Sequence, residues 1–267
     1  MRATVSFSEP KARGYMPPAN EEEKLLQRRV ADLCRAAQYG QTVRLTGFLS
    51  DREQELARAA LSGFEGHARF WGGFEGAERQ MLALGADREP QEEEFGILCL
   101  RVEPQFSDKP LTHRDYLGSL MGLGIKRESV GDIAVLPEGG ALVYAKQPAA
   151  RLIEEELSTV GRSAVRVTKA GPLVPPQPAT PPEERTATVP SLRLDAVLAV
   201  MLHLGRSAAA QLIKSGAVSV NHIETSSAHY EVFESDVFRV RGYGKYKLCK
   251  AGAQSKKGRI IISYCQY

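Results

Sequence analysis

The sequence contains few cysteines, a single tryptophan and no long apolar run. Its four cysteines, Cys34, Cys99, Cys249 and Cys265, form no Cys-x-x-Cys pair, which argues against a zinc knuckle or a redox dithiol and favours a reducing compartment. No segment approaches the ~18 apolar residues that a membrane-spanning helix needs. The first twenty residues contain prolines and lack the apolar core of a signal peptide. We therefore expect a cytoplasmic protein without a membrane segment, a metal site or a cofactor.

The overall composition is ordinary, but the charge is unevenly distributed along the chain. The 267 residues are 43% hydrophobic and 25% charged, which excludes chain-wide disorder and a collagen-like fibre. The formal net charge is only +3. Residues 1–185 hold 24 basic and 27 acidic residues, whereas residues 186–267 hold 11 basic and 5 acidic residues. The basic C-terminal segment predicts a polyanionic partner, most often nucleic acid.

Prolines divide the chain. Seven of the fifteen prolines lie in residues 171–190, a composition that favours extended backbone and predicts an interdomain linker. A long ordered loop is the alternative, although such loops are uncommon inside compact domains. The predicted regions are a mostly helical N-terminal region over 1–85, a middle domain over 86–170, the linker over 171–190 and a C-terminal domain over 191–267.

The N-terminal region carries several helix signals. Apolar residues recur at helical spacing over 21–38. A second helix is predicted from Ser50, which has capping-box spacing with Glu53. A short strand is expected over 68–71, followed by a turn into a third helix over 72–84.

The middle domain alternates between strand and helix patterns. Strands are predicted over 95–102, 131–136, 141–146 and 163–168, and helices over 113–122 and 148–160. This β-α-β-β-α-β order is that of ferredoxin-like folds and of RRM-type RNA binders, so the fold class is α+β. An RRM that stacks bases needs aromatic side chains on its central strands, and those strands offer only Phe95 and Tyr144. We favour an RRM-like fold without a stacking platform over a base-stacking RRM.

The C-terminal domain begins with a basic helical segment. Residues 191–222 predict two short helices and a strand, with apolar residues at helical spacing over 194–201 and expected partners at Leu212 and Ile213. Ser207 is the expected N-cap of the second helix. The basic residues of the two helices are Arg193, Arg206 and Lys214.

A basic hairpin is predicted over residues 238–248. Its turn is expected at Gly242 and Gly244, because glycine suits the backbone of tight turns. Side-chain alternation is expected to place four cations on the solvent side of the hairpin. These are Arg239, Arg241, Lys245 and Lys247.

The C-terminal domain resembles the RNA-binding module named after ribosomal protein S-four, also called the alpha-L module. The matching residues are Arg193-Leu194-Asp195, Arg206-Ser207, the run from Leu212 to Asn221, and the run from Arg241 to Gly244. In that module a helix pair and the loop after the first strand dock on folded RNA. The resemblance therefore implies RNA contacts at Arg193, Arg206, Ser207, Lys214, Asn221 and His222. The sequence departs from the pattern at Gly205, where Ser is usual, and at Ser235, where Gly is usual.

Further segments resemble the YlmH family, whose architecture is shared with photosystem II S-four-domain proteins. They are FLSDREQEL, GGFEGAER, HRDYLGSLMGLGIKRESVGDI and SKKGRIIISYCQY. The resemblance implies a bacterial cytoplasmic protein that binds tRNA and the rRNA of the large ribosomal subunit, without DNA specificity. Members act in ribosome-associated quality control, where they hold peptidyl-tRNA on obstructed large subunits, and their genes often lie among cell-division genes.

Lys126 and Arg127 form a second basic spot. They are expected either to contact an RNA phosphate or to complement the dipole at the C-terminus of a helix. If five or six cations touch phosphates, the log-log salt slope of RNA binding is expected to be about −4 to −5.

Two other functions stay open. One is a protein-interaction scaffold of cell division or photosystem assembly. The other, less favoured, is an RNA-modifying enzyme such as a pseudouridine synthase, whose catalytic Asp also lies in an Arg-Leu-Asp triplet; here that triplet belongs to the module. The predicted function is thus non-enzymatic RNA binding on the ribosome.

Overall fold

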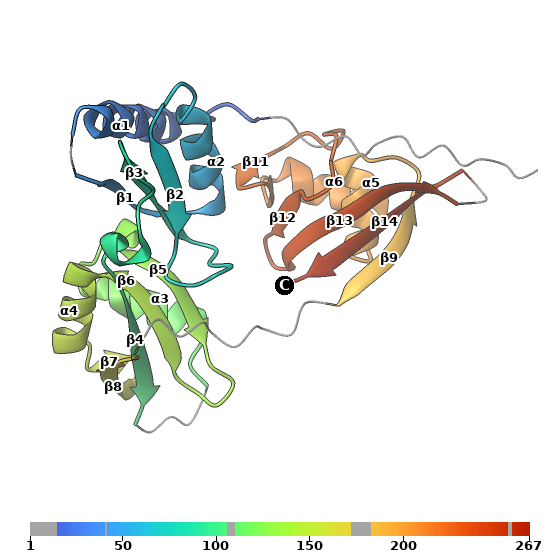
Figure 1. The fold of residues 1–267 in the computed structure, drawn as a ribbon. Helices are drawn as coiled ribbons and strands as arrows, with labels where there is room; N and C mark the ends of the chain where they lie inside the picture. The colour runs from blue at the N-terminus through green and yellow to red at the C-terminus, as the bar shows by residue number, and fades with distance from the viewer. Residues whose placement is uncertain (1–14, 41, 106–109, 172–182, 256–257) are drawn as a thin grey trace, which may run out of the picture. The chain divides into compact units, whose positions relative to one another are not determined.

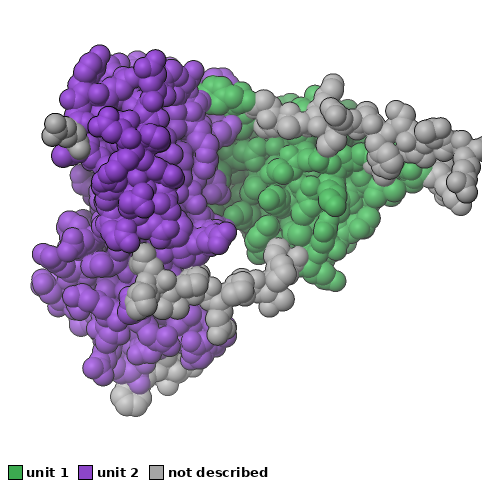
Figure 2. Space-filling view, viewed as in Figure 1, with its two compact units in different colours: residues 1–16, 180–267 green, residues 17–179 purple. Residues whose placement is uncertain are grey.

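The structure is a computed structural model that describes residues 15–40, 42–105, 110–171, 183–255 and 258–267. The chain divides into two compact units, coloured separately in Figure 2. Residues 17–179 are called the N-terminal unit. Residues 180–267, with the described part of residues 1–16, are called the C-terminal unit. Each unit is described by itself.

The first half of the N-terminal unit is a layer of two helices on a three-stranded sheet (Figure 1). Its elements are α1 (Glu21–Gln38), β1 (Arg44–Leu49), α2 (Asp51–Ala60), β2 (His67–Trp71) and β3 (Gln80–Gly85). The helix predicted over 21–38 and the strand near 68–71 are confirmed. The Ser50 and Glu53 capping box is also present, with the Ser50 N–H donating to Glu53 Oε2 at 2.7 Å.

The helix predicted over 72–84 is wrong. Residues Gln80–Gly85 form β3, the central strand of an antiparallel sheet in the order β1-β3-β2. Met81 and Ala83 face one side of this sheet and Leu82 and Leu84 the other, and all four are fully buried. A strand buried on both faces is apolar at every position, so its short run has no period that separates it from a buried helix.

The second half of the N-terminal unit has the predicted ferredoxin-like order. Its elements are β4 (Ile97–Pro104), α3 (His113–Gly122), β5 (Val130–Val135), β6 (Ala141–Lys146), α4 (Gln147–Glu156), β7 (Thr159–Val160) and β8 (Ser163–Lys169), with short 3-10 turns at η1 (Glu92–Phe95) and η2 (Arg127–Ser129). The antiparallel sheet runs β5-β6-β4-β8-β7. Four strands give the RRM-like sheet, and the two-residue β7 is an addition at its edge.

Both faces of this RRM-like sheet are covered. Helices α3 and α4 pack on one face through residues such as Tyr116 and Ile153. The other face, which carries Tyr144, packs on Phe48 and Met81 of the three-stranded sheet. Tyr144 is fully buried, and its ring centroid lies 4.7 Å from that of Phe74. The regions predicted separately as 1–85 and 86–170 therefore share a core within one unit.

Hydrogen bonds from two charged side chains to backbone groups join the two sheets of the N-terminal unit. The Asp132 carboxylate accepts the backbone N–H groups of Glu78 at 2.7 Å and Arg79 at 3.0 Å. The Arg79 guanidinium donates to the backbone carbonyls of Phe48 at 2.9 Å and Val130 at 3.2 Å. Because these groups come from both sheets, they fix the sheets against each other.

The C-terminal unit packs two helices against a six-stranded sheet. Its elements are β9 (Glu184–Val189), α5 (Leu194–Met201), α6 (Arg206–Lys214), β10 (Val218–Val220), β11 (Ile223–Glu224), β12 (Val237–Val240), β13 (Gly244–Gln254) and β14 (Ile260–Gln266). The strand order is β11-β10-β12-β13-β14-β9. No single helix in the described part of the chain is long and apolar enough to cross a membrane; α5 and α6 reach that length and composition only as a pair, bent by 114°.

The linker predicted over 171–190 ends earlier than expected. Residues 172–182 lie outside the described residues, whereas Glu184–Val189 is strand β9. This strand pairs in continuous antiparallel register with β14, from Val189 opposite Ile260 to Glu184 opposite Cys265. The proline-rich composition stops at Pro182, and the Thr and Val residues that follow favour a strand.

We expect Gly73→Ala to destabilise the N-terminal unit more than Gly76→Ala does. Both glycines have positive φ, at +103° and +84°. A Cβ at Gly73 would lie 2.9 Å from the Tyr144 ring, whereas a Cβ at Gly76 would meet nothing within 4 Å. Urea unfolding followed by Trp71 fluorescence should show losses of about 2–4 kcal/mol for Gly73→Ala and about 1 kcal/mol for Gly76→Ala. Equal losses would contradict the close packing of the two sheets.

Candidate nucleic-acid interface

The two helices of the C-terminal unit are held by the apolar stripes that the sequence predicted. Leu194, Val197, Leu198 and Met201 of α5 and Ile213 of α6 are buried, and they pack against strand residues such as Phe238, Val240, Tyr246 and Leu248. Burying these stripes fixes where both helices begin. Arg193 immediately precedes α5, and Arg206 is the first residue of α6.

Arg193 and Arg206 share one carboxylate, that of Asp195. Arg193 donates from Nε at 3.1 Å to Oδ1 and from Nη2 at 2.9 Å to Oδ2. Arg206 donates from Nε at 3.0 Å to Oδ2 and from Nη2 at 3.4 Å to Oδ1. Asp195 is only 4% exposed, whereas the side chains of Arg193 and Arg206 are 36% and 50% exposed. We call these three residues the arginine pair site; its net charge is +1.

The pKa of Asp195 reflects this arrangement. Burial acts to raise the pKa of the carboxyl, but the hydrogen bonds from Arg206 and Arg193 outweigh it, so the pKa lies below its ordinary value. The carboxylate is therefore ionised at neutral pH, and it orients both guanidinium groups. The Arg-Leu-Asp triplet is visible in the sequence, but the hydrogen bonds from Arg206 to Asp195, eleven positions earlier, are not.

The first turn of α6 lies beside Arg206. The N-cap is Gly205 and not the expected Ser207, which is the second helical residue and is exposed. No side chain in the described residues caps this helix, and its first bond to the cap is from the Ala209 N–H to the Gly205 carbonyl at 3.1 Å. Backbone N–H groups at a helix N-terminus favour an anion. Together with the Arg206 guanidinium they suit a phosphate.

The strand cations lie on a different face of the module. Phe238 and Tyr246 point into the core with the helices, so by alternation Arg239 and Lys245 point to the opposite face of the sheet. Arg239 lies directly opposite Lys245 in register, and Lys247 lies on the same face. On this expected solvent side Arg239 is exposed, whereas Lys245 and Lys247 are half-buried. The helix cations and the strand cations lie on different faces of the module, because the sheet separates them.

The remaining strand and helix cations are exposed at the ends of their elements. Arg241 follows β12 at the hairpin turn, and Lys214 is the last residue of α6. The Lys245 Nζ lies 5.2 Å from the centroid of the Tyr267 ring.

Asn221 has a structural task in the loop after β10. Its Nδ2 donates to Asp236 Oδ1 at 2.8 Å, and its Oδ1 accepts the Val237 N–H at 2.8 Å. Both Asn221 and Ser235 have left-handed φ, at +47° and +69°. Ser235 thus occupies a conformation that the usual Gly would adopt with less strain. We assign Asn221 to shaping this loop, on which His222 is exposed.

The second basic spot differs from expectation. Lys126 is exposed, but Arg127 is half-buried and donates to the backbone carbonyls of Val130 and Gly131. Burial, followed by repulsion from Arg79, lowers the pKa of Arg127 to about 10. Arg127 therefore stabilises the turn into β5, and only Lys126 stays a candidate for a phosphate contact.

Two cysteines that are distant in the sequence meet on the sheet. Cys249 Sγ lies 3.4 Å from Cys265 Sγ, on neighbouring strands β13 and β14. Burial, then the contact with Cys265, raises the pKa of the Cys249 thiol to about 11, so the thiol is protonated at neutral pH. The described residues contain no group of three or more His, Cys, Asp or Glu side chains placed to hold a metal ion.

Comparisons with known proteins agree with this architecture. A family model described as "Putative RNA-binding domain in YlmH" matches residues 90–171, and one described as "S4 domain" matches residues 192–238. A Bacillus subtilis (strain 168) relative, "Ribosome-associated protein quality control protein P2", is 33% identical over 225 residues, which cover 83% of this chain and 86% of the relative. The chain belongs to the YlmH family.

The YlmH-family assignment confirms the resemblance found in the sequence, and the S4 domain is the alpha-L module predicted there. A solved structure, "Cell division protein ylmH from Streptococcus pneumoniae", matches with a TM-score of 0.51 and 20% identity. That match covers 59% of this YlmH-family chain and 96% of the other chain. At this identity the likeness concerns the fold alone.

We expect Asp195→Asn to destabilise the C-terminal unit in a pH-dependent way. An acid whose pKa is lower in the folded state stabilises the fold above its ordinary pKa, near 4, and this contribution is lost as the pH falls through the folded value. At neutral pH the substitution should cost about 1–3 kcal/mol, because bonds between charged groups are replaced by weaker ones.

Hydrogen exchange of α5 and α6 measures this effect. The difference between Asp195→Asn and the wild type should shrink as the pH falls below about 4, the ordinary carboxyl pKa, and through the lower folded pKa, because the wild-type carboxyl then becomes protonated as well. Glu224→Gln removes an exposed acid from the same unit and serves as the control. A difference that stays constant with pH would contradict the assigned role of Asp195.

Proposed function

We propose that this protein binds rRNA and tRNA on the large ribosomal subunit without catalysing a reaction, and acts in ribosome-associated quality control by holding peptidyl-tRNA. The observation that carries the proposal is the arginine pair site beside the uncapped N-terminus of α6, within an S4 domain. The name of the Bacillus relative supports the process. Each guanidinium retains N–H groups beyond those given to Asp195, and these are available to phosphate oxygens.

The helix face is the better primary contact. Asp195 fixes the direction of both guanidinium groups before RNA arrives, so less side-chain freedom is lost on binding. Of the strand cations, Lys245 and Lys247 carry compact point charges on flexible side chains, which fix the direction of a phosphate contact less than a guanidinium does. We assign Arg206, Ser207 and Arg193 to the primary RNA contact, and Arg239, Lys245 and Lys247 to a second contact on the other face.

The RRM-like sheet is not the base reader in this proposal. A base-stacking RRM exposes aromatic rings on the sheet face away from its helices. Here that face is covered by the three-stranded sheet, and Tyr144 is fully buried. The RRM-like half instead supports the fold of the N-terminal unit, and Lys126 is its remaining candidate contact.

A catalytic role fits the Arg-Leu-Asp triplet poorly. An Asp that acts as a nucleophile or base must reach the substrate. Asp195 is 4% exposed and accepts hydrogen bonds from two arginines. Its geometry suits positioning and not attack, which supports an adaptor over an RNA-modifying enzyme.

We expect Arg206→Gln to weaken binding to purified large ribosomal subunits by about tenfold, the effect of losing one charge-assisted phosphate contact. The log-log salt slope should also fall in magnitude by about one from a wild-type value of about −4 to −5. A single substitution of Arg206 is preferred to a substitution of both arginines, because Arg193 still pairs with Asp195 and the buried carboxylate is not left without a cation. Sedimentation of the complex at several salt concentrations measures both quantities.

Arg166→Gln is the matched control, since it removes one exposed positive charge from the N-terminal unit. It should leave affinity and slope nearly unchanged. Failure of the wild type to sediment with large subunits at low salt would contradict the proposal. Equal losses in Arg206→Gln and Arg166→Gln would instead indicate nonspecific attraction. Intact ribosome binding by Arg206→Gln, with loss of a protein partner, would favour the scaffold.

A further inference from the structure

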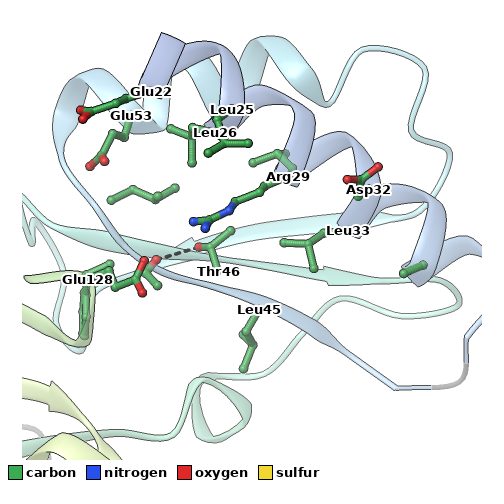
Figure 3. A pocket seen from close by; sticks show the side chains of 15 residues that line it. Glu22, Leu25, Leu26, Arg29, Asp32, Leu33, Leu45, Thr46, Glu53 and Glu128 are labelled. Carbon is green, nitrogen blue, oxygen red and sulfur yellow. Dashed lines mark hydrogen bonds between the residues drawn. The ribbon is translucent and has the colours of Figure 1, made fainter. Parts of the chain in front are cut away.

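The N-terminal unit contains a groove that the RNA proposal does not use. The groove has a volume of about 670 Å³ and lies between helix α1 and strand β1 (Figure 3). That volume is typical of sites that enclose most of a bound ligand. Strand β1 is at one end of its sheet, and no other strand in the described residues pairs with its outer edge. An unpaired edge offers backbone donors and acceptors to an extended chain.

The wall formed by α1 is apolar and accessible. Leu25 is 50% exposed, and Leu26 and Leu33 are half-buried along the same side of the helix. Leu45 of β1 also lines the groove, but its side chain points away from α1 and packs on the core of Phe48, Met81 and Tyr144. Single exposed leucines are ordinary, but several that converge on one hollow indicate a surface that aliphatic side chains can cover.

The groove is closed at the middle of β1. A Cβ at Gly47 would lie 2.7 Å from the backbone oxygen of Glu128, so turn η2 touches the strand there. The edge of β1 is therefore open over only a short length. This limits the occupant to a short segment and excludes the addition of a long strand.

The rim of the groove is acidic. Its ionisable lining residues are Glu22, Asp32, Glu53, Glu128 and Arg29, a formal net charge of −3; Asp32 also pairs with Arg35, which lies outside the lining, so the rim keeps a negative charge of about −2 when that cation is counted. In Figure 3 Glu22 and Glu53 lie at one end above the strand, Glu128 lies below it, and Asp32 lies at the other end. Phosphates are repelled by such a rim, so RNA is a poor occupant, whereas a cationic ligand is attracted.

We propose that this groove binds a short, extended peptide segment of a partner protein, in which basic residues alternate with aliphatic ones. The aliphatic side chains pack on Leu25, Leu26 and Leu33, and the basic side chains meet the acidic rim. The backbone of the segment faces the open part of the β1 edge. The proposal is independent of the RNA-binding function, because it concerns other residues in the other unit.

Fluorescence anisotropy with labelled heptapeptides tests this site on the full-length protein. The probe alternates lysine with leucine. One comparison peptide alternates lysine with serine, which removes the apolar anchors, and another alternates glutamate with leucine, which reverses the charge. The lysine–leucine peptide should bind tightest, and both comparison peptides should bind at least about tenfold more weakly.

Substitutions locate the binding on the protein. Glu22→Gln combined with Glu128→Gln should weaken the lysine–leucine peptide about three- to tenfold, and Leu25→Ser should do the same. The matched controls are Glu154→Gln with Glu155→Gln, and Leu152→Ser, all exposed positions on α4. These controls should leave the affinity unchanged. All of the altered side chains are exposed, so the fold is expected to persist, and circular dichroism checks this.

The sign of the Arg29 effect is the sharpest criterion. Arg29 is the one basic residue among the groove's lining residues, and its side chain extends from α1 toward β1 in Figure 3. Arg29→Gln should tighten a cationic peptide about two- to fivefold. Weaker binding in Arg29→Gln, tighter binding of the glutamate–leucine peptide or of single-stranded RNA, or equal effects of groove and control substitutions would overturn the proposal. Concentration-dependent self-association lost in Leu25→Ser would assign the groove to a second copy of the chain and would also overturn it.

Discussion

The salt contact of Arg193 and Arg206 with Asp195 is the interaction on which the account of the C-terminal unit depends. An almost fully buried carboxylate is costly unless it is paired, and here two guanidinium groups pair with it. The same bonds that satisfy the acid hold the arginines half-exposed at the starts of two helices. In the proposed function, stability and RNA recognition therefore use the same three residues, and the site keeps a positive charge in spite of its acid.

Burial of the RRM-like sheet has a comparable consequence for the N-terminal unit. Covering the sheet face that reads bases in other RRM-type domains removes one route to RNA. The covered face also joins the two halves into one unit, and hydrogen bonds of Arg79 and Asp132 to backbone groups stabilise the junction. The helix layer of that unit leaves Leu25 of α1 and a short part of the β1 edge accessible, which is the surface that we propose for a peptide partner.

Local patterns predicted much of this structure, and tertiary contacts account for the rest. The capping box at Ser50 and the helix over 21–38 depend on neighbours in sequence, so they were predictable. Strand β3 was not, because its apolar run is set by burial on both faces. The order of the middle strands followed from alternation, but the cover over Tyr144 comes from a segment about seventy positions earlier.

The candidate site shows the same division. The resemblance carried by Arg193-Leu194-Asp195 and the matching segments after it implied the alpha-L module, and the S4 match confirms it. Three features were not predictable from the sequence. Arg127 donates to backbone carbonyls, and Asn221 hydrogen-bonds within the loop after β10. The helix cations and the strand cations lie on two faces of the module. Crosslinking the protein to large ribosomal subunits and mapping the RNA-linked peptides by mass spectrometry tests the central claim most directly. The account predicts crosslinks within residues 193–214; crosslinks confined to the outer strand face or to the N-terminal unit would contradict it.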